Sequence, residues 1–382
     1  MSRRRKRIGI LTGGGDCAGL NAVIRAVFRT AYNTGWDVLG IEESFGGLLD
    51  TKKTKLLKPR DVRGILHTGG TILGASNRGH PFRFPVETPS GVVYQDRSNE
   101  VVRNFRALKL DGLVVVGGDG TLAIALGLHR KGVPVVGVPK TIDNDLSGTA
   151  VTFGFDTAVS VATEALDRLH TTASSHRRVM VMEVMGRNVG WIALYAGVAG
   201  GADVILIPEI PFDIETVVQK IRERNRLGRD FSIVVVAEGA LPVGGKKMYR
   251  EKADGGYEGR LGGIGERVAE EIQKRTKQEC RALVLGHLQR GGQPTSFDRV
   301  LGTRFGSAAV RLAREGQWGQ MVALAPPDIV SIPLEKAVAK LKRVPEQSDV
   351  VRAARDLGIT FGESVREISK RGSRGGLVLR RP

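Results

Sequence analysis

The sequence predicts an α/β protein of two doubly wound domains with largely parallel sheets, and three observations lead to this prediction. Short β-branched runs recur along the chain and are continuously apolar, which is typical of strands covered on both faces. Amphipathic helical patterns separate these runs, and 382 residues are more than one hydrophobic core usually serves. The runs are IGIL (8–11), LVVVG (113–117), VPVVGV (133–138), VMVMEV (179–184), VILI (204–207), SIVVVAEG (232–239) and ALVLG (282–286).

Two segments illustrate the helical pattern between the strands. Residues 21–32 place Val23, Ala26 and Val27 on one side, and residues 156–170 repeat apolar side chains at helical spacing. Ligands of such sheets bind beyond the carboxyl ends of the strands. We therefore expect the functional site in the loops that follow the apolar runs.

The composition is ordinary for a globular protein, with 41% hydrophobic and 26% charged residues, but its charge is not. Lys and Arg number 58 against 40 Asp and Glu, a formal net charge of +18. This excess favours phosphate-bearing partners, either nucleic acid or phosphorylated small molecules. The basic ends, 2–7 and 369–382, are interpreted as solvated tails, and no nucleic-acid recognition motif accompanies them.

The cysteines and the apolar runs indicate a cytoplasmic protein. The two cysteines have neither metal-ligand spacing nor a disulfide framework, which fits a reducing cytosol. The apolar run after the basic start is too short for a secretory signal, and no run approaches the ~18–20 residues of a membrane span.

Two glycine-rich turns follow early strands. TGGGDCAGLN (12–21) offers a close backbone approach and free helix N–H groups to an anion, although a tight packing turn is an equal alternative. VVVGGDGTL (114–122) is the stronger pattern for a phosphate cradle. Its Asp119 is a candidate ligand for Mg²⁺, which favours one or two carboxylates together with phosphate oxygens. This second motif predicts phosphoryl transfer and leaves the acceptor open.

PKTIDND (139–145) places a lysine and two carboxylates directly after an apolar strand. A solvated polar loop is one interpretation. Phosphoryl transfer offers another, because it requires donor positioning, charge neutralisation and a base for the acceptor hydroxyl. Asp143 is then the candidate base, Thr141 a hydroxyl donor and Lys140 the neutralising charge.

Six motifs follow one another along the chain: GGDGT, PKTIDND, SSHRR (174–178), VMGRNVGWIA (184–193), PEIPF (208–212) and LGHLQRGGQPTSFDR (285–299). In this order, and over about residues 8 to 310, the sequence resembles 6-phosphofructokinases. The similarity implies transfer of the terminal phosphoryl group of ATP to the 1-hydroxyl of fructose 6-phosphate, with Mg²⁺ as cofactor, in glycolysis.

The resemblance also implies roles for individual residues. Asp119 would serve Mg²⁺, Asp143 would take the proton from the 1-hydroxyl, and Arg187 would meet charge on the transferring phosphoryl group. Implied donor-site residues are Gly15, Arg78, Gly118, Asp119, Gly120 and Thr121. Implied substrate-site residues are Thr141, Ile142, Asp143, Arg178, Met185, Gly186, Arg187, Glu238, Arg281, His287, Leu288, Gln289 and Arg290, with His287 and Arg290 on the 6-phosphate.

Arg178 and Arg281 would reach the 6-phosphate of a neighbouring subunit, so the resemblance implies a homodimer or homotetramer. It further implies a donor domain of residues 1–154 with about 289–340, and a sugar-phosphate domain of 155–288 with about 341–382. The active site would lie in the cleft between these domains. The Gly- and Lys-rich residues 242–265 are expected to form a surface hairpin or flexible insertion.

The basic residue near the nucleotide and the effector site are less defined. Asn77 and Arg78 compete for the basic position, and Arg78 is preferred because a guanidinium bridges phosphates. Arg25 and Arg29 fall where shorter bacterial enzymes bind effectors, but they also suit a solvated helix face.

Residues 120 and 140 determine the expected donor. Gly120 leaves room for the α-phosphate and nucleoside of ATP, whereas pyrophosphate enzymes commonly carry Asp there. Lys140 is the residue found in pyrophosphate enzymes, but a lysine beside phosphates repels neither donor. ATP is therefore expected, with pyrophosphate as the alternative donor. The sequence also leaves open a kinase that acts on a different sugar phosphate, such as sedoheptulose 7-phosphate, and a non-catalytic protein associated with nucleic acid.

Overall fold

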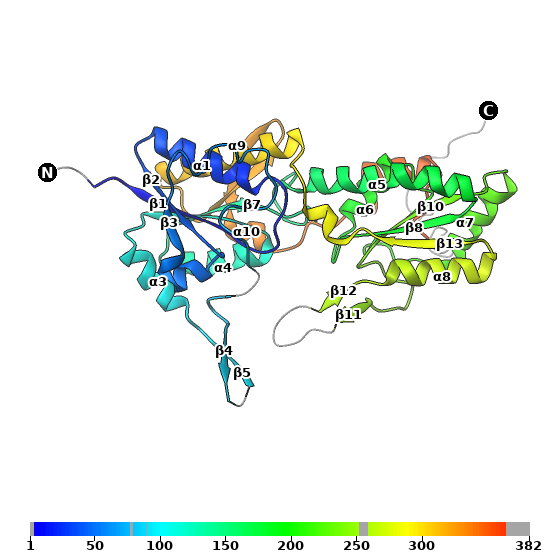
Figure 1. Cartoon of the computed structure of the whole chain (residues 1–382), viewed down its shortest axis with the longest axis horizontal. Helices are drawn as coiled ribbons and strands as arrows, with labels where there is room; N and C mark the ends of the chain where they lie inside the picture. Colours follow the sequence, from blue (N-terminus) through cyan, green and yellow to red (C-terminus); the bar gives the residue numbers. More distant parts are fainter. Residues whose placement is uncertain (1–3, 77–78, 90, 252–258, 364–382) are drawn as a thin grey trace. The chain divides into compact units, whose positions relative to one another are not determined.

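The computed structural model describes residues 4–76, 79–89, 91–251 and 259–363, and it divides the chain into two compact units. Unit 1 comprises Met1–Ala158 and Arg290–Lys342, and unit 2 comprises Val159–Gln289 and Arg343–Pro382. The predicted α/β class with doubly wound, mostly parallel sheets is confirmed (Figure 1).

Unit 1 is built on a seven-stranded sheet in the order β15-β14-β7-β6-β1-β2-β3. The five inner strands are parallel, and the two edge strands are antiparallel to their neighbours. The strands are β1 (Arg7–Thr12), β2 (Asp37–Ile41), β3 (Thr54–Leu56), β6 (Gly112–Gly117), β7 (Val135–Pro139), β14 (Gln320–Ala325) and β15 (Asp328–Pro333).

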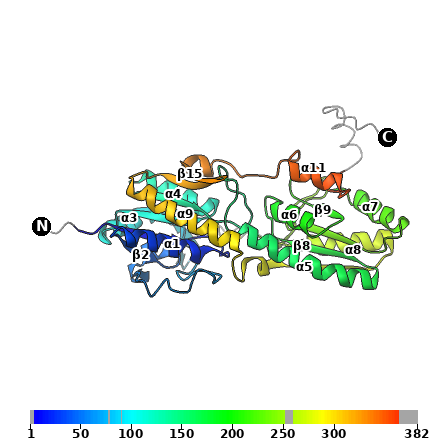
Figure 2. The same cartoon turned by 90° about the horizontal axis from the view of Figure 1, so that it is seen from above.

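Helices cover both faces of this sheet (Figures 1 and 2). On one face α9 lies along α1, and on the other α3, α4 and α10 pack on the buried side chains of the strands. The helices are α1 (Leu20–Asn33), α2 (Gly46–Leu49), α3 (Ser98–Ala107), α4 (Asp119–Arg130), α9 (Ser296–Arg314) and α10 (Leu334–Val338), with the short 3₁₀ turn η1 (Thr51–Lys53). The long helix α5 (Phe155–His176) begins in unit 1 and continues in unit 2. A separate antiparallel hairpin joins β4 (Phe84–Thr88) to β5 (Gly91–Gln95).

Local sequence explains where several helices begin. Thr295 caps α9 by accepting a hydrogen bond from the backbone N–H of Asp298, and Asp213 caps α7 (Ile214–Arg226) by accepting from the backbone N–H of Glu215. Such caps satisfy N–H groups that have no partner within the helix. In α1 the buried side includes Val23 and Val27, as the apolar spacing predicts.

Unit 2 contains a four-stranded parallel sheet in the order β13-β8-β10-β9. The strands are β8 (Val179–Val184), β9 (Val204–Leu206), β10 (Ser232–Ala237) and β13 (Cys280–Val284). The helices are α6 (Trp191–Ala199), α7 (Ile214–Arg226), α8 (Ile264–Thr276) and α11 (Asp349–Asp356), with the 3₁₀ turn η2 (Gly286–Arg290) at the boundary. Within residues 242–265, β11 (Tyr249–Glu251) pairs antiparallel with β12 (Arg260–Leu261).

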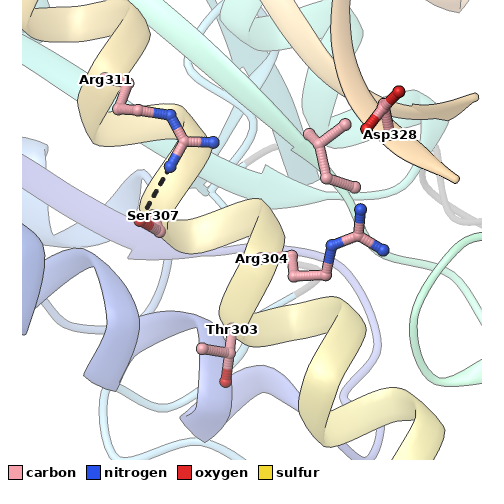
Figure 3. A pocket seen from close by; sticks show the side chains of 6 residues that line it. Thr303, Arg304, Ser307, Arg311 and Asp328 are labelled. Carbon is pink, nitrogen blue, oxygen red and sulfur yellow. Dashed lines mark hydrogen bonds between the residues drawn. The ribbon is translucent and has the colours of Figure 1, made fainter.

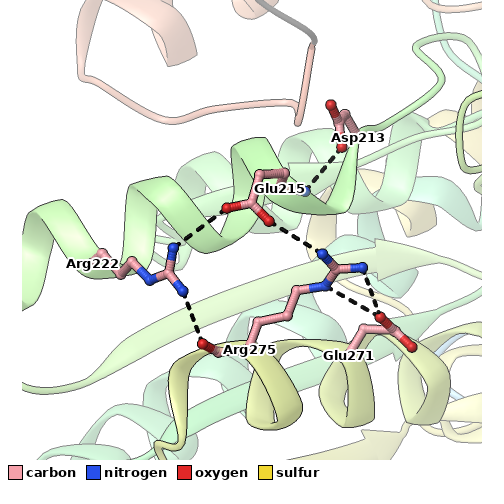
Figure 4. Close-up of polar contacts among 5 residues, drawn as sticks. All are labelled: Asp213, Glu215, Arg222, Glu271 and Arg275. Carbon is pink, nitrogen blue, oxygen red and sulfur yellow. Dashed lines mark hydrogen bonds and ion pairs between the residues drawn. The ribbon is translucent and has the colours of Figure 1, made fainter.

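Helices α7 and α8 are joined at the surface by a network of charges (Figure 4). Glu215 of α7 accepts from Arg222 of its own helix at 3.4 Å and from Arg275 of α8 at 3.2 Å. Arg275 also binds Glu271 one helical turn earlier. Because these side chains are 36–50% exposed, each ion pair adds little to the free energy of unfolding. The contacts mainly fix the position of one helix against the other.

Among the described residues no helix is long and apolar enough to cross a membrane.

Candidate active site

Three loops of unit 1 meet at one edge of its sheet, because β1, β6 and β7 are adjacent and parallel. Gly13 N–H donates to the Val116 carbonyl at 2.9 Å, and Lys140 N–H donates to the Gly117 carbonyl at 3.0 Å. These bonds continue the strand pairing into the loops after β1, β6 and β7. The glycine-rich turn, the GGDGT turn and PKTIDND are thereby brought side by side at the carboxyl edge, where doubly wound sheets bind ligands.

The glycines of the first turn allow this close packing. A Cβ on Gly13 would lie 2.6 Å from Thr121 Cγ2, and a Cβ on Gly15 would lie 2.7 Å from a guanidinium nitrogen of Arg290. Gly14 adopts φ +74°, a conformation that favours glycine. The backbone of this turn is therefore in contact with the side chains of two of the other predicted site residues.

Gly120 has a different environment. In the described part of the chain, no atom lies within 4 Å of the position that a Cβ would take there, and its φ is not left-handed. Asp119 and Gly120 are exposed in the first turn of α4, whereas Thr121 is buried. A larger side chain at position 120 would therefore extend into open space without displacing protein atoms.

Two cations lie against the glycine-rich turn. Lys140 is 4% exposed, and its Nζ donates a short hydrogen bond to the carbonyl of Gly15. Arg290 donates to the carbonyl of Asp16 at 3.1 Å. Burial lowers the pKa of Lys140, and the charge of Arg290 lowers it further. The neighbouring thiol of Cys17 is neutral, because burial raises its pKa to about 12.

The PKTIDND loop gathers carboxylates at the same edge. Asp143 N–H donates to Thr141 Oγ1 at 3.1 Å, and Asn144 adopts φ +53° between the two aspartates. Asp145 is 8% exposed, and its Oδ1 has no hydrogen-bond partner among the described residues. Burial, followed by the charges of Asp143 and Asp119, raises its pKa to about 7. Like charges that disfavour ionisation create a potential that attracts a cation.

These residues suit a magnesium ion that is bound mainly by substrate. Over the residues that the structure describes, no group of three or more His, Cys, Asp or Glu side chains is arranged to hold a metal. Mg²⁺ needs only one or two carboxylates when phosphate oxygens and water complete its shell. Asp119 is exposed and can supply one carboxylate ligand, and the negative electrostatic potential of Asp143 and Asp145 would attract the ion. Asp145 was not among the predicted site residues, although its spacing within PKTIDND was a usable signal.

In unit 2 the loops after β8 and β10 are neighbours, since Val184 pairs with Ala237. Gly186 takes φ +146°, and a Cβ there would lie 2.7 Å from the Val189 carbonyl. The backbone N–H of Glu238 donates to the Val184 carbonyl at 2.9 Å. Met185, Gly186, Arg187 and Glu238 therefore share one edge of the sheet.

The insertion at 242–265 supports this edge, a role that the sequence did not indicate. Lys247 donates to the carbonyl of Arg187 at 2.8 Å and to Asn188 Oδ1 at 2.7 Å. Arg187 itself donates to the Gly259 carbonyl at 2.9 Å. Glu209 of PEIPF adds a further anchor, accepting from the N–H groups of Gly190 and Val344 at 3.0 and 2.9 Å.

The LGHLQRGG segment forms the turn η2 after β13. Gln289 is 1% exposed, and it joins two loops by accepting from Met185 N–H at 3.3 Å and donating to the Gly286 carbonyl at 3.0 Å. His287 and Leu288 are exposed, so His287 is not a packed core residue. Ile142 is buried, which limits it to main-chain contacts with a ligand.

Arg178 and Arg281 lie at the opposite edge of the unit 2 sheet. Arg178 precedes β8 and Arg281 is the second residue of β13, whereas Met185 follows β8. The six residues of β8 lie between Arg178 and Met185, so the two ends are about 23 Å apart at the usual strand rise of about 3.3 Å per residue. Glu279 bridges the two arginines, at 2.7 Å to Arg178 and 2.6 Å to Arg281. The hydrogen bond from Arg178 lowers the pKa of Glu279.

The predicted site residues thus fall into three groups. At the carboxyl edge of the unit 1 sheet lie Gly15, Gly118, Asp119, Gly120, Thr121, Lys140, Thr141, Ile142, Asp143 and Arg290. At the carboxyl edge of the unit 2 sheet lie Met185, Gly186, Arg187, Glu238, His287, Leu288 and Gln289, and at its amino edge lie Arg178 and Arg281. Arg78, with its competitor Asn77, lies outside the described residues.

The cavity drawn in Figure 3 is not part of these groups. It has a volume of about 440 Å³ between α9 and β15, and Arg311 donates to Ser307 in its wall at 3.1 Å. None of its lining residues belongs to the predicted site.

Comparison with known proteins identifies the family. The phosphofructokinase family model matches residues 7–313. The chain belongs to the phosphofructokinase family. It is 55% identical to the ATP-dependent 6-phosphofructokinase of Chloroflexus aurantiacus over 96% of this chain and 100% of that protein. It is 50% identical to the ATP-dependent 6-phosphofructokinase 2 of Clostridium perfringens over 95% of this chain and 100% of that protein.

Solved phosphofructokinases share the fold. The T-state phosphofructokinase of Pichia pastoris matches with a TM-score of 0.77 and 31% identity, over 93% of this chain but only 37% of the Pichia chain. The pyrophosphate-dependent phosphofructokinase of Marinobacter aquaeolei matches with a TM-score of 0.75 and 24% identity, over 94% and 92% of the two chains. The resemblance deduced from the six sequence motifs is confirmed by the family match.

Proposed function

We propose that this phosphofructokinase is ATP-dependent and transfers the terminal phosphoryl group of ATP to the 1-hydroxyl of D-fructose 6-phosphate. The product is fructose 1,6-bisphosphate, so the enzyme acts in glycolysis. The observation that carries this proposal is the convergence of the three loops after β1, β6 and β7 at one edge of the unit 1 sheet. Full-length relatives at 50–55% identity bear the name ATP-dependent 6-phosphofructokinase.

Unit 1 is proposed to bind the donor. The backbone of Gly15 and Gly118 would approach the phosphates, and Thr121 and Gly120 would complete the turn at the start of α4, where free N–H groups favour an anion. Asp119 would hold Mg²⁺, which would neutralise negative charge on the donor phosphates when bound. Arg78 stays a candidate for the nucleotide contact.

Phosphoryl transfer requires little covalent chemistry from the protein and depends on positioning and charge. Asp143 would accept the proton of the 1-hydroxyl as the hydroxyl oxygen attacks the γ-phosphorus and the bond to ADP breaks. Lys140 and Arg187 would offset the negative charge that develops on the transferring group. The buried position of Lys140 beside the glycine-rich turn supports its role, because charge acts more strongly where water is excluded.

Unit 2 is proposed to bind the sugar phosphate through Met185, Gly186, Arg187 and Glu238. His287, Leu288, Gln289 and Arg290 would hold the 6-phosphate end, and Thr141 and Ile142 would contact the sugar from the PKTIDND loop. The exposure of His287 supports this assignment, because an imidazole buried in a core could not reach a ligand.

Arg178 and Arg281 are proposed to act on the 6-phosphate of a neighbouring subunit in a homodimer or homotetramer. Their separation from Met185 by the length of strand β8 supports this, because one phosphate cannot reach both edges of one sheet. Arg281 also lines a cavity of about 650 Å³ next to Lys274 and Lys277, which leaves room for a group from another molecule.

ATP is proposed as the donor, with pyrophosphate as the alternative. The open space at Gly120 supports ATP, since no atom of the described residues lies within 4 Å of the position that the Cβ of an aspartate would take. The cysteines Cys17 and Cys280 are both free, which supports a reducing, cytoplasmic location.

The decisive experiment is a donor panel on the purified protein, with ATP or pyrophosphate, fructose 6-phosphate and Mg²⁺. ATP-dependent formation of fructose 1,6-bisphosphate that stops on chelation of Mg²⁺ is expected. Turnover with pyrophosphate alone would reverse the donor assignment. Turnover with neither donor, together with salt-sensitive binding of nucleic acid, would favour the non-catalytic alternative. Sedoheptulose 7-phosphate in the same panel tests the alternative acceptor.

A further inference from the structure

The end of unit 1, Lys340–Lys342, runs beside the PKTIDND loop although almost two hundred residues separate them. Leu341 forms an isolated antiparallel bridge with Leu146. Lys342 N–H donates to the Asp145 carbonyl at 2.7 Å, and Ser147 Oγ donates to the Lys340 carbonyl at 2.8 Å. The main chains of the two segments are therefore in register.

The side chain of Lys342 folds over the loop and uses its ammonium group there. Nζ donates to Asn144 Oδ1 at 2.7 Å, to the Ala150 carbonyl at 2.9 Å and to the Thr149 carbonyl at 3.1 Å. An ammonium group has three N–H donors, and three acceptors of the loop are available to them. Lys342 thus connects the middle of PKTIDND to the chain that follows it.

Asn144 is the residue of the loop that most needs support. It adopts φ +53°, a left-handed conformation that is uncommon for a residue with a side chain. It lies directly between Asp143 and Asp145, so its conformation sets the direction of both carboxylates. A hydrogen bond from Lys342 to its amide oxygen fixes the side chain that accompanies this backbone geometry.

Further hydrogen bonds lead from Asn144 through Thr152 to Thr141, nearer the start of the loop. Asn144 Oδ1 also accepts from Thr152 N–H at 3.1 Å, and Thr152 Oγ1 donates to the Thr141 carbonyl at 2.7 Å. Thr141 Oγ1 in turn accepts from Asp143 N–H. A chain of hydrogen bonds therefore leads from Lys342 to the backbone of Asp143.

We propose that Lys342 is a positioning residue for phosphoryl transfer, which holds Asp143 in reacting orientation through Asn144 and the carbonyls of the loop. The proposal rests on the proposed role of Asp143 as base. Lys342 does not touch substrate in this scheme. Its loss would loosen the loop by a small displacement, and misplacement of reacting groups by about 1 Å can cost on the order of 10²-fold in rate.

The test compares Lys342→Met with a matched control, Lys336→Met. Both changes remove one ammonium from the same part of the chain, but the side chain of Lys336 is exposed on α10. Lys342→Met is expected to lower kcat at least about tenfold, with the KM for fructose 6-phosphate within about threefold of wild type. Lys336→Met should match wild type in both constants.

Hydrogen exchange provides a readout that does not depend on turnover. The Thr152 amide donates to Asn144 Oδ1, so its exchange should accelerate in Lys342→Met and stay at the wild-type rate in Lys336→Met. If wild type proves inactive with ATP and fructose 6-phosphate, the proposed function fails, and this exchange rate still decides whether Lys342 holds the loop. Unchanged protection of Thr152 in Lys342→Met would overturn the proposal.

The variant Asn144→Gly distinguishes a loss of orientation of Asp143 from a general loss of protein stability. Glycine accepts the left-handed backbone without strain but removes the amide oxygen. We expect the same fall in kcat as in Lys342→Met, and no further fall in the double variant, because both changes break the Lys342–Asn144 hydrogen bond on which the proposal depends. Additive losses would refute the shared pathway. If Lys342→Met does not fold, Asn144→Gly alone decides: a wild-type kcat in this variant would overturn the proposal.

Discussion

Replacing Gly120 by aspartate is expected to exclude ATP from the donor site while leaving the protein folded. Among the residues that the structure describes, no atom lies within 4 Å of the new Cβ, so the substitution begins in open space. Position 120 is also in the first turn of α4, where a carboxylate is favoured by the helix dipole. The free energy of unfolding should therefore change little. Any loss of activity would then result from poorer use of the donor and not from unfolding.

The magnitude follows from charge. A carboxylate at position 120 would face the α-phosphate of ATP, and two unit charges about 4 Å apart repel by roughly 4 kcal/mol at an effective dielectric constant near 20. Solvent and Mg²⁺ reduce this repulsion, so a loss of about 10²-fold or more in kcat/KM for ATP is expected. Pyrophosphate has no nucleoside to exclude, and Lys140 is already available to neutralise it.

The assay is kcat/KM for both donors in wild type, Gly120→Asp and Gly120→Asn. Asparagine has nearly the shape of aspartate without its charge. It therefore separates steric exclusion of ATP from electrostatic repulsion of its α-phosphate. Activity with pyrophosphate should appear in Gly120→Asp or fall far less than activity with ATP. An equal loss with both donors would show that position 120 supports the loop without selecting the donor.

Three further predictions concern single carboxylates and the paired arginines. Asp143→Asn should lower kcat by about 10²–10⁴-fold with little change in substrate binding, and more than a tenth of wild-type activity would remove Asp143 as the base. Arg178→Ala or Arg281→Ala should raise the KM for fructose 6-phosphate about tenfold or more, since charge-assisted bonds to phosphate contribute about 1.5–3 kcal/mol. Mixed oligomers of Arg178→Ala and Asp143→Asn should regain activity, and the absence of recovery despite proven subunit exchange would exclude a shared site. Because the pKa of Asp145 is raised from 3.8 to about 7, the folded protein binds an extra proton between these values, and its stability falls as pH rises through them. Asp145→Asn should therefore increase the free energy of unfolding at pH 8 by about 1–3 kcal/mol and change it little at pH 4, as measured by urea denaturation at both pH values.

The sequence alone was sufficient for the fold class and for the segments that carry the chemistry. Strands β1, β6, β7, β8, β9, β10 and β13 overlap the seven apolar runs. The first six are largely buried on both faces, which explains their continuously apolar sequence, whereas β13 is an edge strand with exposed side chains. The exposed edge strands β3 and β15 carry mixed side chains and were not predicted, and the buried inner strands β2 and β14 were missed as well. GGDGT and PKTIDND could be recognised because each chemical motif is contiguous.

The residues that hold the site residues in place became apparent only in the tertiary structure. Lys342 lies 198 residues from Asn144, and Gln289 lies 104 residues from Met185, so no local pattern relates the two partners. Lys247 belongs to an insertion with weak periodicity, yet it holds the backbone of Arg187. A hydrogen bond between distant residues depends on how the whole chain packs, whereas a motif depends on neighbours along the chain. For this reason the reacting groups were visible in the sequence, and the residues that orient them were not.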